Sequence, residues 1–247
     1  MPVTEFALEY AVDALSPVRK SAAAVIVAAG GSSRMGGLSK QLLPLCGVPV
    51  LARSMLAFQK NGRISRIIVV ARTEDMGDIQ KMAGEYKITK LTDLVEGGAS
   101  RAESVQKGVA LCREEMVAIH DGARPLVTQA VIDRVLDGAE LYEAAACAVA
   151  VKDTVKETES TGRVLSTPQR SRLRLVQTPQ AFSLPLYREA AALAGDALET
   201  LTDDCAVVEA AGKPVYLVEG DYANIKITTP EDMAVAEALF MYGEKNI

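Results

Sequence analysis

The chain has 247 residues, 49% of them hydrophobic, which is enough to bury the core of one large domain. A formal net charge of -5 argues against a nucleic-acid-binding surface, so cations that meet an anionic ligand would have to be concentrated locally. The four cysteines are scattered without a C-x-x-C spacing, and His120 is the only histidine. This pattern gives poor support to a zinc site or to a mechanism that pairs a histidine with a nucleophile.

The chain shows no run of about eighteen uncharged apolar residues that could span a membrane. Its first residues carry Glu5, Glu9 and Asp13 rather than the basic flank of a signal peptide. We therefore expect a cytoplasmic protein without a membrane or nucleic-acid partner. Residues 1–20 have the spacing of a short amphipathic helix, and we treat them as an N-terminal extension of no assigned function.

An apolar run over residues 22–29 is followed by a glycine-rich loop that carries Arg34 and Lys40. The run has the length of a buried parallel strand. The glycines let the backbone approach a ligand closely and point its N–H groups at an anion. With the two cations added, the loop is suited to hold a polyphosphate. An ordinary strand-to-helix turn with a solvated arginine and lysine is the alternative.

Two better-known phosphate loops fit this stretch poorly. A dinucleotide fingerprint requires a glycine where Ser32 stands, and no acidic residue follows at a strand end about twenty positions on. A Walker loop requires a lysine and a hydroxyl side chain where Gly37 and Leu38 stand. Neither motif therefore describes the loop.

The next segments alternate between helix and strand patterns. An irregular stretch over residues 42–50 leads into a helix over 49–62. A strand over 64–71, a helix over about 74–84 and a third apolar run that ends at Val95 follow. This alternation predicts βαβ units and a mostly parallel sheet.

A second glycine turn lies at residues 96–104. Ser100 and Glu103 have the spacing of a capping box, which would open a helix to about Glu114. Taken alone, the turn favours a plain helix N-cap over a ligand-binding turn.

A short buried strand over residues 116–120 ends directly before Asp121 and Arg124. In an open α/β sheet, charged residues just past the carboxyl end of a strand lie where ligands bind, so these two are site candidates. The alternative is an ion pair that braces the turn before a helix over 128–142. His120 is better explained as a structural histidine than as a catalytic one.

Another buried strand over residues 144–151 precedes a change in pattern. Residues 152–176 hold nine charged residues, with branched residues alternating around Gly162. The pattern predicts an exposed β-hairpin arm. Because such an arm has little core of its own, we expect it to dock on a second copy of the chain and to make a homodimer.

Residues 176–182 return the chain to the body. The remaining elements are, in order, a helix near 184–194, a helix that Thr202 would cap, a strand over 214–219, a short strand over 224–227 and a final helix from Thr229. Lys226 lies at the edge of its strand, where a solvated lysine and a site lysine explain it equally well. The whole predicts one α/β domain over 21–151 and 177–247 with the arm inserted at 152–176.

Six motifs occur in a fixed order: AAGGSSRMGG with a lysine three positions on, GGASRAESV, HDGARP, TPQAF, TDD and NIKIT. Together they resemble the sugar-phosphate nucleotidyltransferases and, within them, the 2-C-methyl-D-erythritol 4-phosphate cytidylyltransferase family, from about residue 22 to residue 240. The resemblance implies a Rossmann-like nucleotidyltransferase fold with a mostly parallel central sheet, flanking helices and a protruding β-arm. It also implies a reaction in which a phosphate oxygen of the acceptor attacks the α-phosphorus of CTP in line and pyrophosphate leaves.

The resemblance assigns roles residue by residue. The catalytic positions are Arg34, Lys40, Arg170 and Lys226. The nucleotide-binding positions are Ala28, Ala29, Gly30, Gly31, Ser32, Gly98, Ser104 and Asp121. The acceptor-binding positions are Asp121, Arg124, Thr154, Arg170, Thr202 and Lys226, of which the two arm residues would reach the site of the neighbouring subunit.

Magnesium or another divalent cation is implied as cofactor, held mainly by the CTP phosphates and water, so no protein ligand set is expected. Ala99 departs from members that carry an acidic residue at this point of the second glycine turn, which leaves a ribose contact there open. One alternative is a cytidylyltransferase for another polyol phosphate, such as ribitol 5-phosphate. A second is a nucleotide-binding module without catalytic activity.

Overall fold

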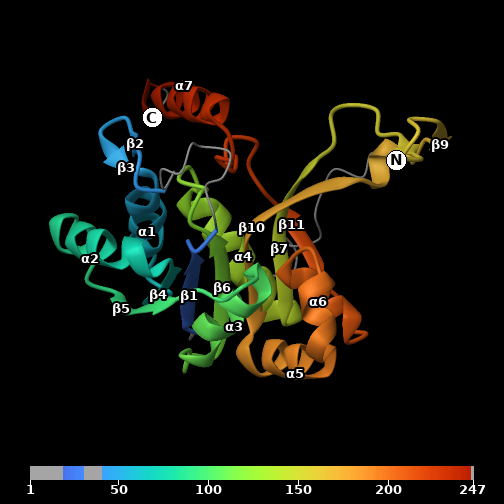
Figure 1. Ribbon diagram of the computed structural model, residues 1–247. Helices are drawn as coiled ribbons and strands as arrows, with labels where there is room; N and C mark the ends of the chain where they lie inside the picture. The colour runs from blue at the N-terminus through green and yellow to red at the C-terminus, as the bar shows by residue number, and fades with distance from the viewer. Residues whose placement is uncertain (1–18, 31–40, 246–247) are drawn as a thin grey trace.

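The computed structural model describes residues 19–30 and 41–245, so the helix predicted within residues 1–20 lies almost wholly outside the described residues. Seven strands form a central sheet in the order β11-β7-β10-β6-β1-β4-β5 (Figure 1). Their bounds are β1 Ala22–Val27, β4 Ile64–Ala71, β5 Leu91–Glu96, β6 Met116–Asp121, β7 Ala144–Ala150, β10 Arg174–Ser183 and β11 Tyr216–Glu219. Only β10 runs antiparallel to its neighbours, β6 and β7. The predicted α/β fold with a mostly parallel sheet is confirmed.

Helices cover both faces of this sheet (Figure 1). One face packs against α1 Val50–Lys60, α2 Met76–Glu85 and α4 Gln129–Tyr142. The other packs against α3 Arg101–Ala110, α5 Leu184–Ala194 and α6 Asp204–Ala210. Short 3-10 helices lie at η3 Thr73–Asp75, η4 Arg170–Arg172 and η5 Gly195–Thr200.

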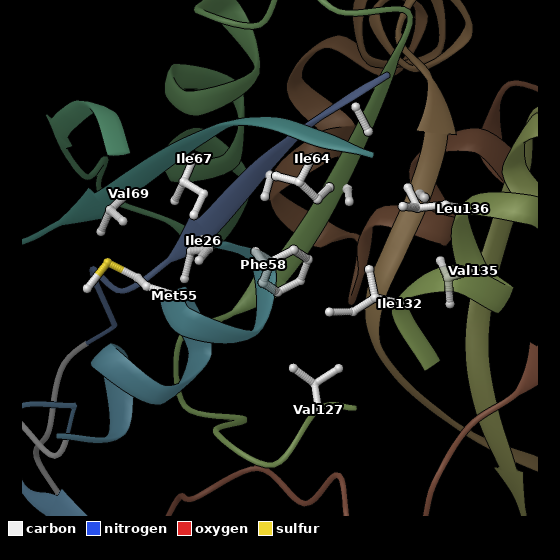
Figure 2. Close-up of a cluster of buried hydrophobic side chains, with 14 of the residues drawn as sticks. Ile26, Met55, Phe58, Ile64, Ile67, Val69, Val127, Ile132, Val135 and Leu136 are labelled. Carbon is white, nitrogen blue, oxygen red and sulfur yellow. The ribbon is translucent and has the colours of Figure 1, made fainter. Parts of the chain in front are cut away.

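Strand β1 shows why this sheet is hydrophobic on both faces. Ala24 and Ile26 belong to the core under α1 and α4, while Ala23 and Val25 belong to the core under α3 and α5. Figure 2 shows the first of these cores, in which Phe58 of α1 lies among Ile26, Ile64 and Ile132. Because successive side chains of a strand point to opposite faces, a strand buried on both sides has to be apolar throughout.

The stretch predicted as irregular before α1 contains a small hairpin, β2 Pro44–Leu45 and β3 Val48–Pro49. Cys46 and Gly47 join the strands with φ angles of 47° and 78°, which suits the right-handed twist of a two-residue hairpin turn. Helix α7, Pro230–Lys245, packs over this hairpin, where Ala236 meets Leu45 and Val50.

The short strand predicted over 224–227 is not formed. The segment instead runs beside the turn after β6, where Arg124 Nη1 donates to the Asn224 carbonyl at 2.7 Å and Ile227 N donates to the Ala123 carbonyl at 2.9 Å. These contacts keep Lys226 next to Asp121, outside the sheet.

The segment between β7 and β10 projects away from the body of the molecule (Figure 1). It contains an antiparallel pair, β8 Glu157–Thr158 and β9 Val164–Ser166. We call residues 152–176 the arm. Val164, Leu165 and Leu175 of the arm are 51–55% exposed, so the arm carries apolar side chains that nothing in the described chain covers. Pairing with β7 starts at Arg174, slightly before the predicted return of the chain to the body.

No helix within residues 19–30 and 41–245 combines the length and the apolar character needed to cross a bilayer.

Candidate active site

The parallel strands β1, β4, β5 and β6 end at the same edge of the sheet. Hydrogen bonds continue the ladders just past their ends: Ala28 N donates to the Val70 carbonyl at 2.6 Å, and Gly122 N donates to the Val27 carbonyl at 2.9 Å. Gly97 N donates likewise to the carbonyl of Ala71 at 2.8 Å. The first glycine loop, the second glycine turn and the turn after β6 therefore start side by side.

Close packing joins the two glycine segments. A Cβ atom on Gly97 would lie 2.3 Å from the Cβ of Ala29, and one on Gly98 would lie 2.3 Å from the Glu103 side chain. Gly98 N donates to Ser104 Oγ at 3.0 Å. Only glycine fits at these two positions, and the contact brings four predicted nucleotide-binding residues into one place: Ala28, Ala29, Gly98 and Ser104.

Helix α3 starts from this second turn. Ser100 Oγ accepts from Glu103 N at 3.1 Å, and the Glu103 carboxylate accepts from Ala99 N at 2.7 Å. The N-cap predicted for Ser100 is thus present, although the carboxylate binds the N–H one residue before the cap. The helix ends at Ala110, earlier than predicted.

Three cations surround the Asp121 carboxylate. Lys226 Nζ lies 2.8 Å from one carboxylate oxygen, and Arg124 Nε lies 3.7 Å from the same oxygen. Arg101 Nη2 lies 3.5 Å from the other oxygen. Burial on its own would raise the pKa of Asp121, but Lys226, Arg101 and Arg124 together outweigh it and lower the pKa to about 2. Three predicted site residues, Asp121, Arg124 and Lys226, thus form one group with an ionised carboxylate at its centre.

Arg101 belongs to this group and was not predicted. Its Nη2 atom donates to the Asp204 carboxylate at 2.7 Å, and the Tyr187 hydroxyl donates to the other oxygen of Asp204 at 2.9 Å. Burial raises the pKa of the Asp204 carboxyl, and Arg101 offsets this only in part. Burial lowers the pKa of Arg101, but Asp204 and Asp121 reverse the shift and raise it. We call Asp121, Arg124, Lys226, Arg101 and Asp204 the Asp121 cluster.

The sequence offers a weak signal for Arg101, which directly follows the second glycine turn. Its partner Asp204 is 103 positions away, so no local spacing links the two.

Thr202 does not cap α6, contrary to the prediction. Asp203 takes the N-cap position, and its carboxylate accepts from Ala206 N at 2.9 Å. The Asp203 carboxylate also accepts from Gln180 Nε2 at 3.0 Å, so it joins the helix start to β10. Thr202 is exposed just before the cap.

The two predicted arm residues belong to the segment between β7 and β10, which projects away from the body of the molecule (Figure 1). Thr154 is exposed, and Arg170 Nη1 donates to the Lys152 carbonyl within the arm at 2.7 Å. Gly30 lies at the exposed end of the first loop. Gly31, Ser32, Arg34 and Lys40 lie outside the described residues.

Comparison with known proteins identifies the family. A family model described as IspD, 2-C-methyl-D-erythritol 4-phosphate cytidylyltransferase, matches residues 22–242. The chain belongs to this family. A relative of that name from Bacillus mycoides is 43% identical over 223 residues, covering 90% of this chain and 98% of the relative. Another from Geobacillus kaustophilus is 43% identical over 218 residues, covering 87% of this chain and 95% of the relative.

Solved structures agree with the membership in the 2-C-methyl-D-erythritol 4-phosphate cytidylyltransferase family. The synthase structure from Anaerococcus prevotii superimposes with a TM-score of 0.79 at 30% identity, covering 90% of this chain and 96% of that one. The cytidylyltransferase structure from Thermus thermophilus superimposes with a TM-score of 0.72 at 34% identity, covering 90% and 98%. The nucleotidyltransferase fold predicted from the motifs is confirmed.

In the described part of this cytidylyltransferase family member, no group of three or more His, Cys, Asp or Glu side chains is arranged so that it could hold a metal ion. The Asp121 carboxylate, at the centre of the candidate site, is already surrounded by three cations, which would repel a divalent ion. Cys112, Cys147 and Cys205 are buried thiols without a disulfide.

Proposed function

We propose that the chain transfers the cytidylyl group of CTP to 2-C-methyl-D-erythritol 4-phosphate, in the synthesis of isoprenoid precursors. A phosphate oxygen of the acceptor forms a bond to the α-phosphorus of CTP. The bond from that phosphorus to the bridging oxygen breaks, and pyrophosphate leaves with the electron pair. The observation that carries this proposal is the family match over residues 22–242, joined by a cation cluster at the carboxyl edge of the sheet.

The charge of the Asp121 cluster supports anionic substrates. Three cations against two carboxylates leave one net positive charge, and the side chain of Lys226 is 40% exposed, so its ammonium can meet a phosphate. Cations held in place before the reaction stabilise developing negative charge without reorganisation. We assign Lys226 and Arg124 to the acceptor phosphate and the transition state, and Asp121 to the junction of nucleotide and acceptor.

The nucleotide lies, in this proposal, over the two glycine segments. The backbone from Ala28 to Ser32 holds the triphosphate and the base. The Ala28 N–H already donates to the Val70 carbonyl, so the N–H groups offered to phosphate begin at Ala29. Gly98 and Ser104 hold the cytosine and ribose side. Arg34 and Lys40 neutralise the α-phosphate and the leaving group.

Magnesium enters, in this proposal, bound to the triphosphate, because the cationic surroundings of Asp121 do not suit a divalent ion. When bound, the ion neutralises phosphate charge and supports the departure of pyrophosphate. The chain's own contribution is to orient the phosphates and the acceptor around it.

The arm completes the site of a second copy of the chain. Thr154 and Arg170 lie away from the Asp121 cluster of their own chain, and the exposed apolar side chains of the arm favour burial against a partner. We therefore propose a homodimer through residues 152–176, in which Thr154 and Arg170 contact the acceptor across the interface and Thr202 contacts it from the body of the other chain. The cytoplasmic location and the lack of nucleic-acid and membrane partners stay predictions from composition.

Pyrophosphate release tests the activity. Purified chain with CTP, magnesium and 2-C-methyl-D-erythritol 4-phosphate is expected to release pyrophosphate, and replacing CTP by ATP or UTP is expected to lower the rate strongly. Turnover with ribitol 5-phosphate alone would move the assignment to that acceptor. CTP binding without turnover of either acceptor would favour a non-catalytic module.

A further inference from the structure

Residues 177–180, QTPQ, lie in the middle of the sheet, and the first three of them lie outside its regular hydrogen-bond ladder. The register between β10 and β7 moves from Val176 opposite Ala148 to Gln180 opposite Ala146, so four steps on one strand face two on the other. Pairing with β6 begins only at Gln180. The bulge leaves the side chains of Gln177, Thr178 and Gln180, none more than 7% exposed, free to bond elsewhere.

Each of these three side chains bonds to a different segment of the candidate site. Gln177 Nε2 donates to the Asp221 carbonyl at 2.8 Å, on the loop that leads to Lys226. Thr178 Oγ1 accepts from Asp121 N at 3.0 Å. Gln180 Nε2 donates to the Asp203 carboxylate, and the side-chain oxygen of Gln180, Oε1, accepts from Cys205 N at 2.9 Å. One buried segment therefore holds all three stretches that carry the predicted acceptor residues of the body.

The partners of His120 fix the direction of the bonds around the Thr178 hydroxyl. The Arg124 carbonyl, 3.2 Å from His120 Nε2, can only accept, so Nε2 carries the proton. Burial lowers the pKa of His120 and keeps the ring neutral, so Nδ1 is the acceptor nitrogen. The Thr178 hydroxyl therefore donates to Nδ1 at 3.1 Å while its oxygen accepts from Asp121 N. A single chain of hydrogen bonds thus runs from the backbone of Asp121 through Thr178 and His120 to the backbone of Arg124.

We propose that Thr178 is a positioning residue for the transfer reaction, which sets the backbone of Asp121 directly and that of Arg124 through the neutral His120. Gln180 does the same for the turn that carries Thr202. This inference rests on the proposed function and names what holds its acceptor half in place. Neither side chain touches the reacting atoms.

Two variants at one position test the inference. Thr178→Val keeps the shape of the side chain but removes the hydroxyl, and Thr178→Ser keeps the hydroxyl. Since small displacements of catalytic groups cost up to about a hundredfold, Thr178→Val is expected to lower kcat at least about tenfold. The KM for CTP should stay within about twofold, and Thr178→Ser should keep at least about a third of the wild-type kcat.

Ile79→Ala is the control for stability, because Ile79 is a buried residue of α2 with no hydrogen bond to the site. Its kcat is expected to stay at the wild-type level although its unfolding midpoint falls. A Thr178→Val enzyme with wild-type kcat would overturn the inference, as would a kcat loss in Ile79→Ala equal to that in Thr178→Val. If Thr178→Val does not fold, Gln180→Met takes its place in the test. This variant is expected to raise the KM for the acceptor at least about fivefold and to leave the KM for CTP unchanged. An unchanged KM for the acceptor would contradict the inference.

Nitrogen NMR of the only histidine separates this inference from the proposed function. Wild-type His120 is expected to show the Nε2–H tautomer at pH 7, and Thr178→Val is expected to change its Nδ1 shift. An Nδ1–H tautomer would overturn the hydrogen-bond chain whatever the activity. If the wild-type protein shows the expected tautomer but no turnover, the proposed function is wrong, whereas the hydrogen bonds inferred between Asp121, Thr178, His120 and Arg124 are still supported.

Discussion

The Asp121 cluster and the arm hold their polar side chains in opposite ways. In the cluster, the Asp121 and Asp204 side chains are 11% and 3% exposed, and each is paired with at least one cation from another part of the fold. In the arm, Arg170 is exposed and bonds to the Lys152 carbonyl of the same arm. The Asp121 cluster forms within one chain, whereas the hydrogen bond described for Arg170 stays within the arm.

This difference shows which side chains of the candidate site are held in position before a substrate binds. Cluster residues are fixed by burial, by the sheet edge and by bonds from the QTPQ segment, so their geometry exists before a substrate arrives. The arm residues have no such support among the described contacts. In the proposed dimer they would gain it by docking, so their contribution should depend on protein concentration. The following predictions separate the two regions.

The largest effect is expected from Lys226→Ala. By analogy with the removal of one preorganised donor, the barrier should rise by roughly 3 kcal/mol, or about a hundredfold in kcat. Steady-state pyrophosphate release measures it. Lys213→Ala, at an exposed lysine after α6, is the control and should keep wild-type turnover; equal losses in both variants would remove Lys226 from the cluster's function.

The next effect concerns stability at acid pH. Burial lowers the pKa of His120 from 6.5 to about 4. Because the folded pKa is depressed, the folded chain resists protonation while the unfolded chain takes up a proton below pH 6.5. Stability is therefore full above that pH and is lost as the pH falls from 6.5 towards 4, by about 2 kcal/mol between pH 7 and pH 5.

Urea unfolding at the two pH values checks this, with His120→Gln as the comparison. The variant is expected to lose about 2 kcal/mol less than wild type over the same interval. An identical pH dependence in both would mean that His120 is not held neutral beside Asp121.

A smaller effect is expected from charge in the arm. Leu165→Asp and Leu175→Asp should give monomers by light scattering and lower turnover about tenfold, roughly 1.4 kcal/mol, because Thr154 and Arg170 no longer reach a second site. CTP affinity should change little. Leu193→Asp, on α5 and 67% exposed, is the matched control. Monomers with full activity would place the acceptor residues elsewhere.

The smallest effect is expected from Ser100→Ala, which removes the N-cap of α3 and should cost about 1 kcal/mol in unfolding free energy. Thr128→Ala removes the equivalent cap of α4, where Thr128 Oγ1 accepts from Val131 N at 3.3 Å. Both should lose similar stability by thermal unfolding. Only Ser100→Ala should also lower kcat, because Arg101 of the Asp121 cluster follows Ser100 directly. The same kcat in both variants would mean that the N-cap of α3 does not affect the Asp121 cluster.

The sequence predicts the elements whose signals are local. The branched run of β4 and the proline-started helix α5 have the predicted bounds, 64–71 and 184–194, since periodicity and caps define them within a few residues. Asp121 and Arg124 could be placed at the sheet edge because ligands bind at the carboxyl ends of parallel strands. Lys226 was assigned to the site only by the resemblance, since the strand predicted around it is not formed.

What the sequence does not predict depends on distant partners. The pairing of β10 with β6 and β7 needs knowledge of its neighbours, and its QTPQ bulge hides the alternation of a strand. The NIKIT segment has a branched pattern typical of a strand, yet the Asn224 carbonyl accepts a hydrogen bond from Arg124. Arg101 belongs to the Asp121 cluster partly because it pairs with Asp204, and only the fold brings these two residues together.

The arm leaves the sheet and returns to it between two neighbouring strands. Ala150, the last residue of β7, stands directly opposite Arg174, the first residue of β10, and paired Cα atoms of antiparallel strands lie about 5 Å apart. A two-residue turn could therefore join the strands in place of everything between them, with the strand order intact. The junction between Ala150 and Arg174 is therefore a site for loop exchange: a shorter, longer or foreign loop could be inserted there without a change in the strand order of the sheet.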